Sequence, residues 1–217
     1  MILAILQARM SSSRLPGKVA MDANGQPMLA YEISRILQSQ KIDQLVIATS
    51  TNPEDDMIEE IAKQCHIECF RGSLNNVLDR YYQCAKKYNA THIVRLTGDC
   101  PIIDANIIDA VIHLHLQSQA DYTSNGVKRT FPDGMDTEIM TFATLQNAFL
   151  NAKTQEELEH VTYYIYTHPE NFRIKHYCND IDYSHIRWTL DYPKDYLLLK
   201  DIIQSQPNNT FSWKDLL

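Results

Sequence analysis

Short, unbroken apolar runs alternate with longer amphipathic stretches through the first half of the chain. Runs typical of buried strands lie at 2–6, 45–48, 67–70 and 92–96. Helical spacing of apolar residues follows each run, at 28–37, 53–64, 73–88 and 104–116. Because strands that are apolar on both faces must be covered on both, this alternation predicts an α/β fold with a mostly parallel sheet between helical layers.

The pattern changes after Gln119, where the candidate elements become shorter. We expect strands at 122–125, 138–141, 172–177 and 186–190, and helices at 143–152, 156–166 and 193–203. We interpret these elements as the rest of one mixed sheet together with a small lobe that covers the substrate. The chain has 217 residues, 44% of them hydrophobic, which is enough for one substantial core, so a single domain over residues 1–217 is expected.

Composition narrows the class of protein. The formal net charge is −7, and a generally acidic surface disfavours non-specific binding to nucleic acid or to an anionic membrane. The five cysteines are scattered, without zinc or redox spacing, which is typical of reduced thiols. The N-terminus has no basic segment, and its apolar run is too short for a signal peptide or a membrane span. We therefore expect a cytoplasmic protein without nucleic-acid or membrane partners.

The loop after the first predicted strand is rich in cations. Residues 7–18 read QARMSSSRLPGK and contain Arg9, Arg14 and Lys18 beside three serines. Ligands of α/β sheets bind beyond the carboxyl ends of the strands, so these cations are placed to neutralise phosphates, to which hydroxyl and backbone N–H groups would hydrogen-bond. The segment matches neither GxGxxG nor a Walker A sequence, which removes the usual dinucleotide and P-loop interpretations. The alternative is a solvated basic loop.

Two other strand candidates end in an aspartate close to a proline. Asp99 lies in RLTGDCP after the strand at 92–96, and Asp191 lies in RWTLDYP after the candidate at 186–190. A carboxylate beside bound phosphates is a typical magnesium arrangement, because Mg²⁺ keeps waters and takes oxygens from the substrate. The pair therefore predicts a magnesium site. The alternatives are a turn aspartate for Asp99 and a helix N-cap for Asp191.

Acidic residues also crowd a glycine turn at 132–138, which reads PDGMDTE. Asp133, Asp136 and Glu138 are suited to hold a hydroxyl-rich sugar, and the alternative is a hairpin turn with solvated acids. Farther along, Glu159 and His160 are adjacent within a helix candidate, so we do not expect them to share a face. The absence of HExxH excludes a zinc-protease interpretation. Substrate contact and an exposed helix surface are both open for this pair.

Taken together, these segments resemble the cytidylyltransferase family of CMP-sugar synthetases, which includes CMP-KDO synthetase and acylneuraminate cytidylyltransferase. The resemblance is closest to the branch named after spore-coat polysaccharide biosynthesis protein F. The matching segments follow the family order over nearly the whole chain, at 7–19, 51–55, 70–82, 95–104, 132–138, 159–162 and 187–195. The resemblance implies a three-layer, Rossmann-like nucleotide-diphospho-sugar transferase fold. It also implies transfer of CMP from CTP to a sugar or sugar acid, with release of pyrophosphate, for surface polysaccharides.

The resemblance assigns roles to residues as well. It implies a nucleotide-binding half at about 1–118 and a sugar- and metal-binding half at about 119–217. The nucleotide contacts implied are Leu6, Gln7, Ala8, Arg9, Ser13, Arg14, Lys18, Thr97 and Asp99. Among these, Arg14, Lys18 and Asp99 are expected to be catalytic, and Asp99 is expected to bind Mg²⁺ together with Asp191. The sugar contacts implied are Asp133, Asp136, Glu138, Glu159 and His160. A homodimer is expected from the family.

Two other functions fit parts of the pattern. A glycosyltransferase of the same fold would consume a nucleotide-sugar, but its usual Asp-X-Asp metal motif has two acids where Gly98-Asp99-Cys100 has one. A non-catalytic nucleotide- or sugar-binding protein is disfavoured because both candidate metal carboxylates and all three loop cations are present. The chain departs from the family at Leu158, since the helix motif usually begins Arg-Glu-His. The family's contacts to acidic sugars are therefore not carried over to this helix.

Overall fold

A seven-stranded mixed sheet forms the centre of the protein, in a computed structural model that describes residues 1–217. The strands are β1 (Ile2–Gln7), β2 (Gln44–Ser50), β3 (Glu68–Gly72), β4 (His92–Thr97), β5 (Tyr122–Ser124), β6 (Glu138–Thr141) and β7 (Ile174–His176). Their order across the sheet is β3-β2-β1-β4-β6-β5-β7, and only β6 runs antiparallel to its neighbours. The predicted mixed, mostly parallel sheet is confirmed.

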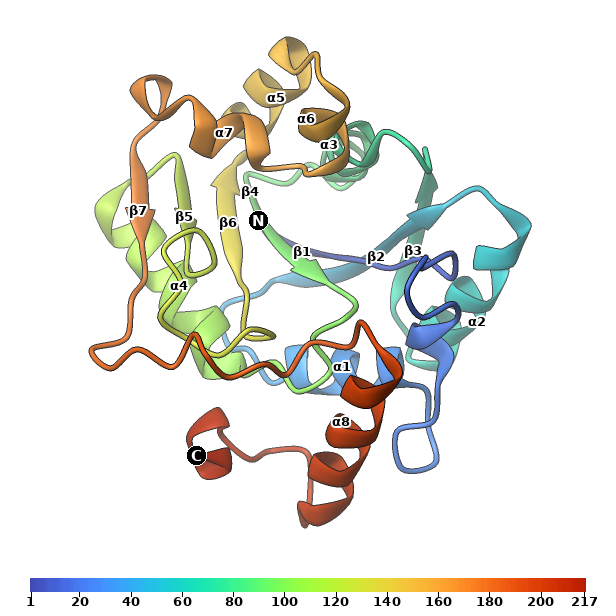
Figure 1. The fold of residues 1–217 in the computed structure, drawn as a ribbon. Coiled ribbons are helices and arrows are strands. Elements are labelled where there is room, and N and C mark those ends of the chain that lie inside the picture. Colours follow the sequence, from blue (N-terminus) through green and yellow to red (C-terminus); the bar gives the residue numbers. More distant parts are fainter.

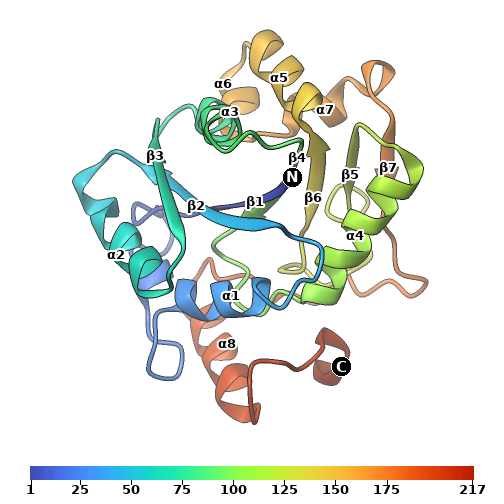
Figure 2. The same ribbon diagram turned by 180° about the vertical axis from the view of Figure 1, so that it is seen from behind.

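Helices cover both faces of this sheet, as Figure 1 and Figure 2 show from opposite sides. One face carries α1 (Met28–Ile36), α2 (Asp56–Gln64), α4 (Ala105–Ser118) and α8 (Pro193–Ser205). The other face carries α3 (Val77–Lys87), α5 (Phe142–Asn151), α6 (Gln155–Glu159) and α7 (Tyr163–Thr167). Short 3₁₀ helices lie at η1 (Lys18–Ala20), η2 (Pro53–Asp55), η3 (Pro169–Asn171) and η4 (Trp213–Leu216). None of the helices is both long and apolar enough to cross a lipid bilayer.

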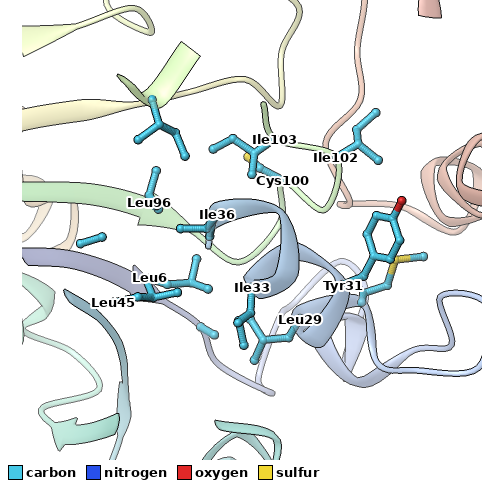
Figure 3. Close-up of a cluster of buried hydrophobic side chains, with 14 of the residues drawn as sticks. Leu6, Leu29, Tyr31, Ile33, Ile36, Leu45, Leu96, Cys100, Ile102 and Ile103 are labelled. Carbon is cyan, nitrogen blue, oxygen red and sulfur yellow. The ribbon is translucent and has the colours of Figure 1, made fainter. Parts of the chain in front are cut away.

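Strand β1 is apolar from Ile2 to Leu6 because it is packed between the two helical layers. Ala4 and Leu6 belong to the core on the α1 side, whereas Leu3 and Ile5 belong to the core on the α3 side. All four side chains are fully buried. Figure 3 shows the first of these cores, in which the apolar face of α1 lies close to Leu6 and Leu96 at the ends of two neighbouring strands.

The order of the strands reverses at β1, and this point positions the site. Strands β2 and β3 extend the sheet on one side of β1, and β4 extends it on the other. Ligands of open α/β sheets bind outside the carboxyl ends of the strands at such a switch point. Gln7 and Thr97 are register partners at this edge, and Gly98 follows directly. A Cβ atom at Gly98 would lie 3.1 Å from the Gln7 carbonyl oxygen, so a larger residue would force the two strand ends apart.

The expected strand at 186–190 is not a strand. Its only ladder contact is an isolated bridge between Arg187 and Asp133. Trp188 and Leu190 are buried in the core on the α1 side, which explains the alternating apolar pattern. The segment is therefore extended and half buried, but it has no neighbouring strand with which to form a ladder.

Two predicted helices also differ from the structure. The helix expected at 156–166 is two short helices, α6 and α7, separated at 160–162. Thr162 donates a hydrogen bond to Glu138 at 2.8 Å, and this buried contact with β6 ties the break to the sheet. The helix expected from residue 73 begins at Val77, because the Asn76 side chain accepts a hydrogen bond from the Asp79 N–H and caps it. The other helices and strands lie within a few residues of their predicted bounds.

Candidate active site

The cationic loop is held in shape by buried polar groups. The Met10 N–H donates to Asp55 Oδ1 at 2.7 Å, and the fully buried Asp55 also accepts from the Ser50 N–H at 3.2 Å. The Gly17 N–H donates to the Met10 carbonyl oxygen at 2.9 Å, and Gly17 adopts a left-handed φ of 71°. This turn leads the chain into η1. Lys18 therefore enters the crevice with only 8% of its surface exposed.

Lys18 lies between the two aspartates that the sequence singles out. Its Nζ donates to Asp99 Oδ2 at 3.2 Å and to Asp191 Oδ1 at 3.0 Å. A backbone bond brings the two carboxylates together, because the Leu190 N–H donates to the Asp99 carbonyl oxygen at 2.8 Å. Side chains that are distant in the sequence thus present carboxylate oxygens to one cation.

Asp191 has the most cationic neighbours in the site. Arg14 Nη2 donates to its Oδ1 at 3.0 Å and Arg187 Nη2 donates to its Oδ2 at 2.8 Å, in addition to Lys18. Burial opposes ionisation of this carboxyl group, but the hydrogen bonds from Arg187 and Lys18 prevail and lower the pKa of Asp191 below its ordinary value. The carboxylate is therefore kept ionised at neutral pH, as a cation-binding group must be.

The placement of Asp99 and Asp191 fits the requirements of a magnesium ion. Mg²⁺ is usually held by one or two carboxylates, while waters and substrate phosphates complete its shell. The Lys18 ammonium group already occupies a cation position between the two carboxylates. No group of three or more His, Cys, Asp or Glu side chains forms a more complete protein cage. Two carboxylates are a donor set that suits a metal ion only when a phosphate ligand and waters supply the other oxygens.

A cavity of about 260 Å³ opens beside these carboxylates at the switch point. Its charged lining consists of Arg9, Arg14, Lys18, Arg80, Arg95, Asp99, Glu159 and Asp191. Five cations therefore face three carboxylates, and the first cavity has a net positive lining. Arg80 and Arg95 each keep a buried Nε–H group without a partner. Unpaired buried donors of this kind are suited to an anionic ligand that satisfies them.

A second cavity, of about 500 Å³, adjoins the first. The wall that the two share is made by Arg95, Thr97, Asp99, His160 and Asp191. The charged lining of the second cavity consists of Arg95, Arg129, Asp99, Asp133, Asp136, Glu138 and Asp191. Two arginines therefore face five carboxylates, and this lining has a net negative charge, opposite to that of the first cavity.

The predicted glycine turn forms one wall of the second cavity. Gly134 has a φ of 111°, and an added Cβ atom would lie 2.7 Å from the Trp188 carbonyl oxygen. The Trp188 N–H donates to the Asp133 carbonyl oxygen at 2.7 Å, which fixes the turn against the segment that contains Trp188. Arg129 closes the same wall through two bonds to Asp136, of 2.6 and 2.7 Å, and one to Asp133, of 2.9 Å.

A buried network connects the shared wall to the sheet. Arg95 of β4 and Glu138 of β6 are register partners and form an ion pair, with 17% and 9% of their side chains exposed. Glu138 also accepts hydrogen bonds from the Tyr122 hydroxyl group and from Thr162. Burial opposes the charge of Arg95, but Glu138 overcomes this and raises the pKa of Arg95 above its ordinary value. The guanidinium group is therefore a fixed positive charge where the cavities meet.

The structure places most of the predicted site residues in one of the two cavities. The first cavity is lined by Gln7, Ala8, Arg9, Ser13, Arg14, Lys18, Thr97 and Asp99, and the second by Asp133, Asp136, Glu138 and His160. The Leu6 side chain lies in the core and lines neither cavity, so the expected nucleotide contact of Leu6 is left to its backbone. Glu159 lines the first cavity and not the second, in contrast to its expected sugar-side position. The expectation that Glu159 and His160 face apart is wrong, because α6 ends at Glu159 and both line the first cavity.

Sequence patterns did not single out Arg80, Arg95 or Arg129. Arg80 lies on the buried face of α3 between Val77 and Tyr81, and Arg95 lies in β4 between the buried residues Val94 and Leu96. A cation among residues that periodicity places in the core is the signal that marks both positions. Arg129 lies in an irregular segment, where no periodicity marks it.

A mostly parallel sheet with a cationic cavity at its switch point is the arrangement of nucleotide-binding α/β enzymes. Comparison with known proteins identifies which class of nucleotide-binding enzyme this is. The sequence model of the family described as "Cytidylyltransferase" matches residues 3–206. The chain is also similar to the spore coat polysaccharide biosynthesis protein SpsF of Bacillus subtilis. The two are 34% identical over 210 residues, which cover 94% of this chain and 86% of that protein.

Solved structures agree with this assignment. A cytidylyltransferase from Leptospira borgpetersenii serovar Hardjo-bovis superposes with a TM-score of 0.96 at 38% identity, covering 99% of this chain and 91% of that one. CMP:2-keto-3-deoxy-manno-octonic acid synthetase, solved in complex with CTP, has the same fold, with a TM-score of 0.70 at 15% identity and coverage of 94% and 98%. The chain belongs to the cytidylyltransferase family and is an enzyme of that class.

Proposed function

We propose that the protein transfers CMP from CTP to a sugar hydroxyl group and releases pyrophosphate, in the biosynthesis of a surface polysaccharide. The triphosphate lies in the first cavity and the acceptor in the second. The observation that carries this proposal is the opposite charge of two adjoining cavities that meet at Asp99 and Asp191. A net positive lining stabilises a triphosphate, whereas carboxylates accept hydrogen bonds from a hydroxyl-rich acceptor.

The nucleotide contacts follow from this placement. Arg9, Arg14 and Lys18 neutralise the triphosphate, and Ser13 hydrogen-bonds to it. Gln7 and Ala8 lie at the end of β1, where the cytosine and ribose are proposed to bind. Gln7 lines the first cavity and its Oε1 atom has no partner in the protein, which supports a contact between its amide group and a base.

In the proposed reaction, an acceptor hydroxyl oxygen attacks the α-phosphorus of CTP. The bond between these two atoms forms, the bond from the α-phosphorus to the oxygen bridging to the β-phosphate breaks, and pyrophosphate leaves with the bonding electrons. The hydroxyl proton passes to solvent. Lys18 and Arg14 offset the charge that develops on the pyrophosphate, and Arg95 is placed to stabilise the transferred phosphate. Bound Mg²⁺, held by Asp99 and Asp191, would polarise the phosphate oxygens.

The acceptor side rests on the second cavity. Asp133, Asp136, Glu138 and His160 line it and are proposed to orient the sugar. The name of the Bacillus subtilis relative, a spore coat polysaccharide biosynthesis protein, supports a role in polysaccharide assembly.

The test is pyrophosphate release from CTP and Mg²⁺ over a panel of sugars. The parent protein is expected to release pyrophosphate with at least one acceptor. Asp99→Asn is expected to reduce turnover by at least about a thousandfold, because a neutral amide is a poor magnesium ligand, while the melting temperature stays close to that of the parent. Asp201→Asn, which changes an exposed aspartate of α8, is the matched control and is expected to keep parental activity.

Two results would contradict the proposal. Parental turnover in Asp99→Asn would refute the metal assignment. Release of a nucleoside diphosphate from a nucleotide-sugar, with no pyrophosphate from CTP, would indicate glycosyltransferase chemistry instead.

A further inference from the structure

Arg129 is the one cation that lines the second cavity without also lining the first, and its charge is already neutralised. It donates from Nη1 and Nη2 to the two oxygens of Asp136, at 2.6 and 2.7 Å, and from Nη1 to Asp133 at 2.9 Å. A guanidinium group that donates two hydrogen bonds to one carboxylate has already used the pair of N–H groups with which it would bind another carboxylate. Arg129 is therefore not available to pair with a carboxylate on a ligand.

The other arginines near this cavity are engaged as well. Arg95 is paired with Glu138 through Nη1, and the residue lines the wall that the second cavity shares with the first. In the proposed function, the remaining N–H groups of Arg95 serve the phosphate of the nucleotide. Arg187 donates to Asp133 at 2.8 Å and to Asp191 at 2.8 Å. Every guanidinium group around the acceptor is thus held by carboxylates of the protein.

The remaining polar groups of the second cavity are suited to hydroxyl groups. Thr189 is 8% exposed, and its buried Oγ1 atom has no partner in the protein. A hydroxyl group can both donate to and accept from such an atom, and it can also donate to a carboxylate oxygen. An ammonium group would be attracted further by the net negative lining.

We infer that the acceptor carries no carboxylate and is a neutral or an amino sugar. This inference rests on the proposed function, since it concerns the acceptor of the same reaction. A sugar acid would place its carboxylate among Asp133, Asp136 and Glu138, where the charge of each lining arginine is already offset by a carboxylate of the protein.

The experiment compares acceptors that differ only in charge. For several hexose configurations, the neutral sugar, the 2-amino-2-deoxy sugar and the uronic acid are supplied with CTP and Mg²⁺, together with 3-deoxy-manno-octulosonate. We expect pyrophosphate release with neutral or amino members, at a kcat/KM at least about tenfold above that of the matching acid. A sugar acid as the preferred acceptor would overturn the inference and leave the proposed function intact. Release from no acceptor would contradict the proposed function itself.

Two variants test the role assigned to Arg129. Asp136→Asn leaves the guanidinium group partly unpaired, so the ratio of kcat/KM for acid over neutral acceptor should rise by about tenfold or more. Asp201→Asn should leave this ratio unchanged. If Asp136→Asn does not fold, Arg129→Gln is the variant to measure. In Arg129→Gln, the kcat/KM for acid acceptors should stay as low relative to neutral acceptors as in the parent. If the parent uses a sugar acid and Arg129→Gln loses that activity, Arg129 binds the ligand carboxylate and the inference is wrong.

Discussion

The ion pair between Arg95 and Glu138 gives the sharpest test of the structure. Glu138→Gln keeps the shape of the side chain and its hydrogen bonds with Tyr122 and Thr162 within reach, but it removes the negative charge. Arg95 cannot move to solvent, because only 17% of its side chain is exposed. The substitution therefore leaves a buried guanidinium group without its counter-charge.

The magnitude follows from the burial of both partners. Removing one member of a buried ion pair costs about 3–5 kcal/mol in the free energy of unfolding. For a chain of this size, each kcal/mol lowers the melting temperature by about 2–4 °C, so we expect a decrease of roughly 6–20 °C. The double variant Arg95→Met/Glu138→Gln should recover more than about 1.5 kcal/mol of this loss, because no buried charge remains.

Chemical denaturation of the parent, the two single variants and the double variant measures this coupling. Glu60→Gln, which changes an exposed glutamate of α2, is the matched control and should shift stability by less than about 0.5 kcal/mol. A loss below about 1 kcal/mol for Glu138→Gln, or single-variant effects that add within about 0.5 kcal/mol, would refute the reasoning.

Two further predictions concern stability. Burial lowers the pKa of His115 to about 4, whereas the unfolded chain takes up a proton below about pH 6.5. Stability is therefore lost as the pH falls from 6.5 towards 4, by about 2 kcal/mol between pH 7.5 and pH 5. Denaturation curves of His115→Gln should show a smaller loss over this range. Equal pH dependence in the parent and the variant would contradict this prediction. Gly134→Ala should destabilise the protein by at least about 2 kcal/mol, because its Cβ would clash with Trp188. Gly25→Ala, at a φ of 90° with nothing within 4 Å, isolates the backbone strain and should cost clearly less; equal melting temperatures would exclude the clash.

The spacing of apolar residues correctly predicted the helices and strands whose local pattern is compatible with only one type of secondary structure. The strand at 138–141 has the predicted bounds, and β1 was recognisable because a strand between two helical layers is apolar on both faces. The segment at 186–190 shows the limit of this reasoning. Its alternation reports that Trp188 and Leu190 are buried, but it does not report whether a neighbouring strand is present.

The site divides in the same way. The strand-end rule brought Lys18 and Asp99 to one edge, because parallel strands that are adjacent in a sheet end together. The partners of Arg129 and Arg95 come from other segments, through contacts that no spacing along the chain encodes. The pairing of charged side chains is therefore set by the folded protein and cannot be predicted from the sequence. The same holds for the opposite net charges of the two cavity linings.

The antiparallel direction of β6 determines which segment of the chain forms the wall of the second cavity. Because β6 runs against its neighbours, its first residue, Glu138, stands at the same edge as the last residues of β1 and β4. The wall of the second cavity, the proposed acceptor site, thus comes largely from the segment at 126–138, whereas that of the first cavity, the proposed triphosphate site, comes largely from 7–18. In the proposed function, insertions or substitutions at 126–138 would change the sugar that is accepted while the nucleotide contacts at 7–18 stay in place. The proposed donor site and the proposed acceptor site are thus separable in the sequence, although they share a wall in the fold.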